Sequence, residues 1–313
     1  MKPYRTIDEQ VALLRLRGLE VQESDRLLLQ RTGYYSLVNG YKIPFLDLQR
    51  TSSQHPEHYR SGSSLAHLGA LYDFDRSLRL HLMRALFASE STLRESVVRQ
   101  FCATFGHGEE YLNHQYYSDG TDGVRTPRGP FEYRESRDWL IGRVLTPIAR
   151  FSGDGSTRRP AFLPAVHHRD KYGYVPMWVT SLKLTFGQVC YLFGHQQLSV
   201  QKKVCADLRE QYRADWGIDG NVFYPNTVDE YYSFLRELRN VCAHDERCFS
   251  HSVAVRRKNR DVSGIAGLVK YFVRRSDYLS MVEGVDSSLS QLENEIPGWA
   301  FLQVAKSVSV QKL

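Results

Sequence analysis

The stretch LAHLGALYDFDRSLRLHLMRALFASESTLRESVVRQF, residues 65–101, decides the fold. Apolar residues recur along it at helical spacings, and neither proline nor glycine occurs between Ala70 and Phe105. The pattern therefore predicts one long helix that buries an apolar stripe against other elements. The stripe consists of Leu65, Leu68, Leu71, Leu78, Leu82, Leu86, Leu93, Val97 and Phe101.

Two acidic residues, Asp75 and Glu90, interrupt this stripe. Both should face toward the core, where an unpaired carboxylate is costly. Each has an arginine four residues further on, Arg79 and Arg94, and this spacing predicts two ion pairs within the helix. The alternative for Glu90 is that it supports a polar functional site.

The segments before the long helix carry their own helix signals. Thr6 and Glu9 form a capping box that predicts a helix start, and Ser24 is expected to open a short helix ending at Gly33. Residues 33–45 are dense in aromatic side chains, which we expect to pack onto the main body rather than to stack on RNA. The three tyrosines concerned are Tyr34, Tyr35 and Tyr41.

The remaining chain alternates expected helices with long loops. Residues 106–136 and 153–176 lack a helical period and are predicted to be loop insertions. A second capping box, Thr227 to Glu230, predicts the start of a helix with one apolar face. The fold class is therefore all-α. We divide it into an N-terminal region at 1–63, a helical domain at 64–255 and a C-terminal helical extension at 256–313.

Composition excludes several classes of protein. The 313 residues are 42% hydrophobic and 24% charged, with 41 Lys+Arg against 35 Asp+Glu, so a globular chain with a mild attraction for polyanions is expected. Five irregularly spaced cysteines do not fit a secreted disulfide framework, and no apolar stretch is long enough for a membrane span. These features favour a soluble, cytoplasmic protein that needs no cofactor.

The segment LRNVCAHDER, residues 238–247, carries the most chemistry. At 100° per residue, a polar arc lies opposite the apolar face of the expected helix. Its members are Arg236, Arg239, Asn240, His244 and Arg247. Since Arg239 and His244 are about 140° apart on the arc, one straight helix does not form a self-contained pair from them. Two such helices packed across a two-fold axis would surround one cleft with both pairs.

That arrangement suits the cleavage of RNA without a metal. Histidine transfers protons near neutral pH, and arginine stays charged while it binds phosphate oxygens. The ribose 2′-OH would attack the adjacent phosphate while His244 moves a proton and Arg239 offsets the developing charge. The alternative is structural, because the helix dipole alone favours basic residues near a helix C-terminus.

Several motifs together resemble the Abi family of abortive-infection proteins, in its AbiD/AbiF-like group, and the all-α HEPN superfamily. The resemblance covers about residues 5 to 255. It rests on GYYS at 33–36 with Tyr41 and Pro44-Phe45, LYDFDRSLR at 71–79 with Glu90 and Arg94, PMW at 176–178, LTFG at 184–187, and RNVCAH at 239–244 with Arg247.

The resemblance implies a HEPN-like helical bundle, a homodimer with a shared active site, and a metal-independent endoribonuclease used as a toxin in phage defence. Arg239 and His244 then take the catalytic roles, with Asn240, Arg247 and Glu90 in support. It also implies RNA as substrate and a structured noncoding RNA as a restraining partner. One departure from the family pattern is the acidic pair Asp245-Glu246 directly after the histidine.

Further basic residues are candidates for phosphate contacts: Arg236, Arg158, Arg159, Arg169, Lys171, Arg256, Arg257 and Lys258. Two other functions stay open. The polar arc can grip phosphates in a noncatalytic RNA-binding or scaffold protein. A metal enzyme is disfavoured, because His55/His58 and His167/His168 lack carboxylates at ligand-like spacing.

Overall fold

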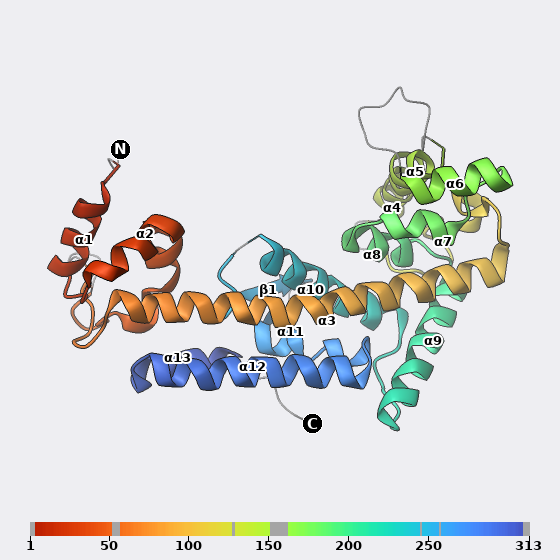
Figure 1. The fold of residues 1–313 in the computed structure, drawn as a ribbon. Helices are drawn as coiled ribbons and strands as arrows, with labels where there is room; N and C mark the ends of the chain where they lie inside the picture. Colours follow the sequence, from red (N-terminus) through yellow and green to blue (C-terminus); the bar gives the residue numbers. More distant parts are fainter. Residues whose placement is uncertain are drawn as a thin grey trace.

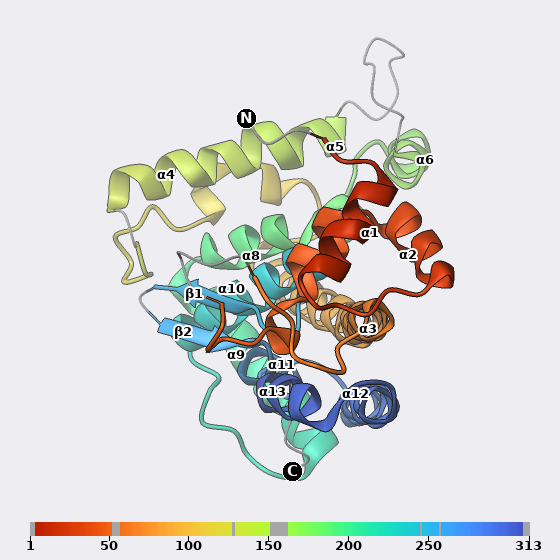
Figure 2. The same ribbon diagram turned by 90° about the vertical axis from the view of Figure 1, so that its left-hand side faces the viewer.

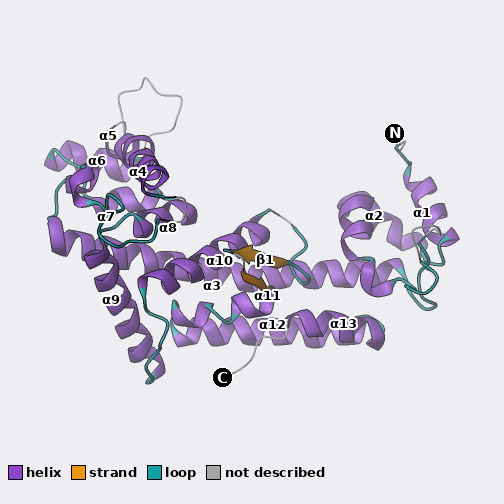
Figure 3. Ribbon diagram, turned by 180° about the vertical axis from the view of Figure 1, so that it is seen from behind, coloured by secondary structure: helices purple, strands orange, loops and turns teal. Residues whose placement is uncertain are grey.

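The computed structural model describes residues 4–51, 57–126, 129–150, 162–244, 246–256 and 258–308. The predicted all-α class is confirmed. Helices make up most of this part of the chain, and within it one two-stranded hairpin is the only sheet (Figure 3).

The long helix α3 (Leu65–Phe105) forms the spine of the molecule (Figure 1). Its 41 residues give a length of about 60 Å. The Ser64 hydroxyl accepts from the His67 N–H at 3.2 Å, and His67 Nδ1 accepts from the Ser64 N–H at 3.2 Å, so a reciprocal cap fixes its start. It ends at Gly106, whose φ of 125° suits glycine. The predicted apolar stripe is buried along its whole length.

The N-terminal helices α1 (Ile7–Leu16) and α2 (Arg26–Thr32) pack over one end of α3. The predicted capping box is confirmed, because Glu9 accepts from the Thr6 N–H at 2.7 Å. The prediction that Ser24 opens α2 is wrong. Ser24 lies inside a single turn, Glu23–Asp25, which the Asp25 carboxylate caps by accepting from the Gln22 N–H at 2.8 Å.

The aromatic segment at 33–45 is only partly buried. Tyr41 and Phe45 are enclosed, and Tyr34 is half-buried, as predicted. Tyr35 is 80% exposed, so the packing role expected for it is wrong. It begins a π-helical turn, Tyr35–Asn39, that buries Leu37 and Val38 instead, and its own side chain points to solvent.

Proline sets helix starts in stretches that the sequence pattern assigned to loops. Helix α4 (Pro130–Trp139) begins inside the predicted 106–136 loop and continues through a π-helical turn, Leu140–Leu145, into α5 (Thr146–Arg150). Helix α6 (Leu163–Tyr172) occupies much of the predicted 153–176 loop. Proline in the first turn needs no backbone N–H partner, which favours a start at both places.

Four helices follow in the chain, and the last of them carries the candidate residues: α7 (Met177–Thr180), α8 (Phe186–Gly194), α9 (Leu198–Trp216) and α10 (Pro225–Ala243). The start of α10 departs from the prediction. The helix begins at Pro225, so Thr227 lies within its first turn and does not cap it. Helices α4 to α8 gather over the far end of α3 from α1 and α2 (Figure 1).

Strands β1 (Ser252–Val255) and β2 (Lys258–Asp261) pair antiparallel with Val253 opposite Arg260. The sequence pattern did not predict this hairpin, which runs across the boundary drawn between residues 255 and 256. Helices α11 (Val262–Ala266), α12 (Arg275–Glu295) and α13 (Gly298–Val308) follow, and α12 lies alongside α3 (Figure 2). Gly284 permits this approach, because a Cβ there would collide with the His81 ring of α3.

Candidate active site

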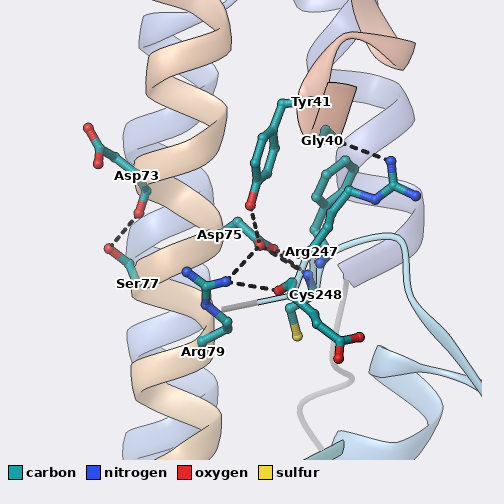
Figure 4. A network of polar contacts seen from close by, with 10 residues as sticks. Gly40, Tyr41, Asp73, Asp75, Ser77, Arg79, Arg247 and Cys248 are labelled. Carbon is teal, nitrogen blue, oxygen red and sulfur yellow. Dashed lines mark hydrogen bonds and ion pairs between the residues drawn. The ribbon is translucent and has the colours of Figure 1, made fainter. Parts of the chain in front are cut away.

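A buried carboxylate joins three segments that are far apart in the sequence (Figure 4). Asp75 is fully buried on α3 and accepts from the N–H groups of Cys248 and Phe249 at 3.0 and 2.6 Å and from the Tyr41 hydroxyl at 2.8 Å. Arg79 lies 3.9 Å away, which confirms the predicted ion pair. Burial raises the pKa of Asp75, and the hydrogen bonds and Arg79 oppose that rise.

Two arginines complete this anchor. Arg79 donates to the Glu246 carbonyl at 2.9 Å, and Arg247 donates to the Gly40 carbonyl at 2.9 Å. The chain that follows α10 is therefore held against α3 and against residues 40–41. The prediction that Arg247 continues the polar arc of the helix is wrong, because α10 ends at Ala243 and the chain turns Arg247 toward the N-terminal region.

The Arg239 side chain of α10 makes no hydrogen bond or ion pair with the described residues. Its Nε is buried without a hydrogen-bond partner, and no ion pair to its guanidinium is found in that part of the chain. Its neighbour Arg236 instead bonds Glu237 at 2.8 Å. A partly buried guanidinium without a direct ion pair is costly to desolvate. Arg239 is therefore suited to an anionic ligand.

Glu90 lies beside Arg239 where α3, α8 and α10 pack together. Burial raises the pKa of the Glu90 carboxyl, and the charges of Arg239 and then Arg94 oppose that rise. The predicted Glu90–Arg94 ion pair is not formed, because Arg94 turns to Glu95 at 3.2 Å and to the Ser91 hydroxyl. This leaves Glu90 without a direct ion pair among the described residues and within the electrostatic field of Arg239.

His244 is exposed directly after the last turn of α10. Its N–H donates to the Asn240 carbonyl at 3.0 Å, and its ring has no partner among the described residues. A solvent-accessible histidine and an unpaired arginine thus lie at the same end of one helix. Asp245, the acid next to it in sequence, lies outside the described residues.

Residues 27–250 match the family model of the Abi-like protein family. The chain belongs to this family, which is linked with abortive infection. The match extends from α2 to the segment that Asp75 anchors, so it contains Glu90, Arg239 and His244. No curated protein and no solved structure matches the chain.

The other basic residues that the sequence suggested for phosphate contacts differ in their surroundings in this Abi-like chain. Arg256 pairs with Asp229, and Lys258 with Glu230 at 2.7 Å, so both fasten the hairpin to α10. On α6, Arg169 pairs with Glu109 at 3.2 Å, and Lys171 lies over the ring of Tyr172. Arg158, Arg159 and Arg257 lie outside the described residues.

A polar groove of about 830 Å³ runs along α10 of the Abi-like chain, next to the candidate residues. Asn240 and Arg236 line it, whereas Arg239 and His244 are absent from its lining. Sequence reasoning did not find this groove, because α4, α8 and β1 contribute its other walls. Nor did it find Asp75 as an anchor. The motifs quoted for the family resemblance contain both Tyr41 and Asp75, but the sequence does not show that these two residues are in contact.

Across the described ranges, no three His, Cys, Asp or Glu side chains cluster in a way that could hold a metal ion. In the same part of the chain, every helix is too short or too polar to cross a membrane. All five cysteines are unpaired.

Proposed function

We propose that this Abi-like protein is a metal-independent, HEPN-type endoribonuclease that acts as a toxin in abortive infection. The observation that carries the proposal is the partly buried Arg239 guanidinium, which has no ion pair among the described residues and lies at the same end of α10 as the exposed His244. Structural contacts engage the other arginines around it: Arg79, Arg94, Arg236, Arg247 and Arg256.

The reaction is an internal transfer of a phosphodiester. The ribose 2′-oxygen bonds to the adjacent phosphorus, the bond from phosphorus to the 5′-oxygen breaks, and the products carry a 2′,3′-cyclic phosphate and a 5′-hydroxyl. His244 takes the proton of the 2′-OH or gives one to the leaving 5′-oxygen, as its ring is free to do. Arg239 offsets the charge that develops on the phosphorane oxygens.

The active unit in this proposal is a homodimer. Ideal helix geometry separates Arg239 and His244 by about 140° around the axis of α10, so in this proposal the arginine of one copy serves the histidine of the other. The exposed face of α3 next to Arg94 offers an apolar surface for the second copy. Leu80 is 72% exposed and Phe87 51%, and they lie two turns apart on that face.

The test is cleavage of RNA by the purified protein in EDTA, with analysis of the product ends. We expect cyclic phosphate and 5′-hydroxyl ends, and a loss of about 10²- to 10⁴-fold in rate for Arg239→Ala and for His244→Ala. Arg213→Ala and His167→Ala change exposed residues on α9 and α6 and should cleave normally. Ends with a 5′-phosphate, or cleavage that needs a metal, would contradict the mechanism.

A mixing experiment tests the shared site. Arg239→Ala and His244→Ala proteins are each inactive, but a mixed dimer contains one intact pair, so mixing them should restore cleavage. If both variants bind RNA and the mixture stays inactive, the separate sites must each be complete. If wild-type protein binds RNA without cutting it, and the variants keep their toxicity, the noncatalytic RNA-binding function is correct.

The restraining partner in this proposal is a structured noncoding RNA in the cytoplasm. Sequencing the RNA that copurifies with the His244→Ala protein from cells tests this, because an inactive toxin retains its partner. One enriched, folded RNA species that suppresses toxicity of the wild-type protein is expected. Recovery of a bound protein in its place would contradict it.

A further inference from the structure

The groove along α10 carries no excess of positive charge. Three arginines and four carboxylates line it, and the cations are largely paired with the acids. Arg236 bonds Glu237 at 2.8 Å, and Arg256 pairs with Asp229. A phosphate backbone would meet as much repulsion as attraction here. The groove therefore suits an uncharged polar group.

One wall of the groove is aromatic and firmly held. Tyr191 of α8 is 44% exposed, and its ring stacks on His195 at 6.1 Å with an interplanar angle of 8°. Trp139 of α4 packs edge-on against Tyr191. Burial lowers the pKa of His195 to about 4, and its Nε2 lies 2.9 Å from the Ser136 hydroxyl. The wall is thus neutral at physiological pH and presents a flat face.

Asn240 lines the groove next to the candidate site. Its side-chain amide has no partner among the described residues, so it offers one acceptor and two donors. A flat aromatic face beside an unengaged amide is a combination that binds nucleobases in single-stranded RNA.

The position of the groove relates it to Arg239. Arg239 and Asn240 are consecutive and therefore 100° apart around α10. On a helix with a radius of about 5.5 Å including side chains, that angle separates their outer ends by about 8 Å. One nucleotide can span this distance with its phosphate at Arg239 and its base in the groove.

We propose that the groove binds the nucleobase next to the cleaved phosphate, with Tyr191 as the stacking surface and Asn240 as the residue that reads the base edge. This inference rests on the proposed function and adds to it the origin of sequence preference. Tyr191 and Asn240 are specificity-determining residues in this assignment, and neither takes part in proton transfer.

The first arm of the test sequences the cut sites in a randomised RNA pool. Wild-type protein should show a base preference at one position beside the cut, and Tyr191→Ala should flatten it while the product ends stay the same. Tyr191→Phe keeps the ring and should keep the preference. The matched control is Tyr172→Ala, which removes an exposed tyrosine of α6 away from the groove. Active Tyr191→Ala protein with an unchanged preference would overturn the inference.

The second arm measures binding of short RNAs to the His244→Ala protein by fluorescence anisotropy, so it needs no cleavage. Adding Tyr191→Ala should raise Kd by about 5- to 150-fold, the equivalent of losing one stacked base. Adding Asn240→Ala should weaken the binding only of RNAs that carry the preferred base. An unchanged Kd in both double variants refutes the groove assignment. If wild-type protein fails to cleave while these binding effects appear, the enzyme proposal fails and the groove assignment stands.

Discussion

Replacing Asp75 by asparagine should destabilise the protein severely and release the segment after α10. The carboxylate accepts three hydrogen bonds from Tyr41, Cys248 and Phe249, and it lies beside a largely buried Arg79. The substituted side chain would keep one acceptor oxygen and turn an amide toward the backbone N–H groups. Removing one member of a buried ion pair costs about 3–5 kcal/mol of stability, and each hydrogen bond lost to a charged acceptor costs about 1.5–3 kcal/mol. Since these contributions overlap, we expect a net loss of about 3–5 kcal/mol.

The assay is urea denaturation followed by circular dichroism, with the free energy of unfolding extrapolated to water. Asp73→Asn is the matched control, because Asp73 is exposed on the same helix and pairs only at the surface with Arg76 at 3.5 Å. It should change the free energy of unfolding by less than about 0.5 kcal/mol. Tyr41→Phe removes one bond to Asp75 and should lie between the two.

The measured coupling decides whether Asp75 acts as an anchor. In a double-mutant cycle, Tyr41→Phe should cost much less in the Asp75→Asn background than in the wild-type protein. The reasoning is refuted if Asp75→Asn loses less than about 1 kcal/mol, or if the two effects simply add. In either case the carboxylate would not hold the segment that carries His244.

Two other predictions concern stability. The folded-state pKa of His195, about 4, lies below its unfolded value of 6.5, so the unfolded chain binds more protons between these values. Stability should fall by up to about 3 kcal/mol as pH drops from 6.5 to 4, and thermal unfolding of His195→Gln should show a weaker dependence on pH; an identical dependence contradicts this assignment. Gly284→Ala should lower the free energy of unfolding by about 1–3 kcal/mol, because overpacking against His81 outweighs the helix propensity of alanine. A rise in Tm would show that α12 can shift away from α3.

Local signals predicted the elements that depend on local physics. The apolar period from Leu65 to Phe101 predicted α3, and Thr6 with Glu9 predicted the start of α1. Helix α6 was assigned to a loop because its apolar side chains are few, and its proline and tertiary contacts decide its structure. The hairpin β1–β2 was not predicted either, since its short strands depend on ion pairs with α10.

The residues of the candidate site likewise include some that a local pattern predicts and some that depend on contacts between distant segments. Arg239 and His244 could be proposed from one short motif, because both lie at the end of one helix. The partners of Asp75 could not, because 173 residues separate it from Cys248. Glu90 shows the limit of a spacing rule. An arginine four residues away predicted an ion pair for Glu90, yet Arg94 pairs with the adjacent Glu95 instead.

The wide sequence separation of the Asp75 contacts also bears on when the candidate site becomes ordered during synthesis of the chain. Chains fold from the N-terminus as they emerge, and α3 can form long before the segment after α10 exists. Until Cys248 and Phe249 arrive, the carboxylate lacks its two backbone donors, and the residues beside His244 lack that attachment to α3. A chain interrupted before that point carries Arg239 on an incomplete scaffold. The anchor thus makes order at the candidate site depend on synthesis of the chain through Phe249.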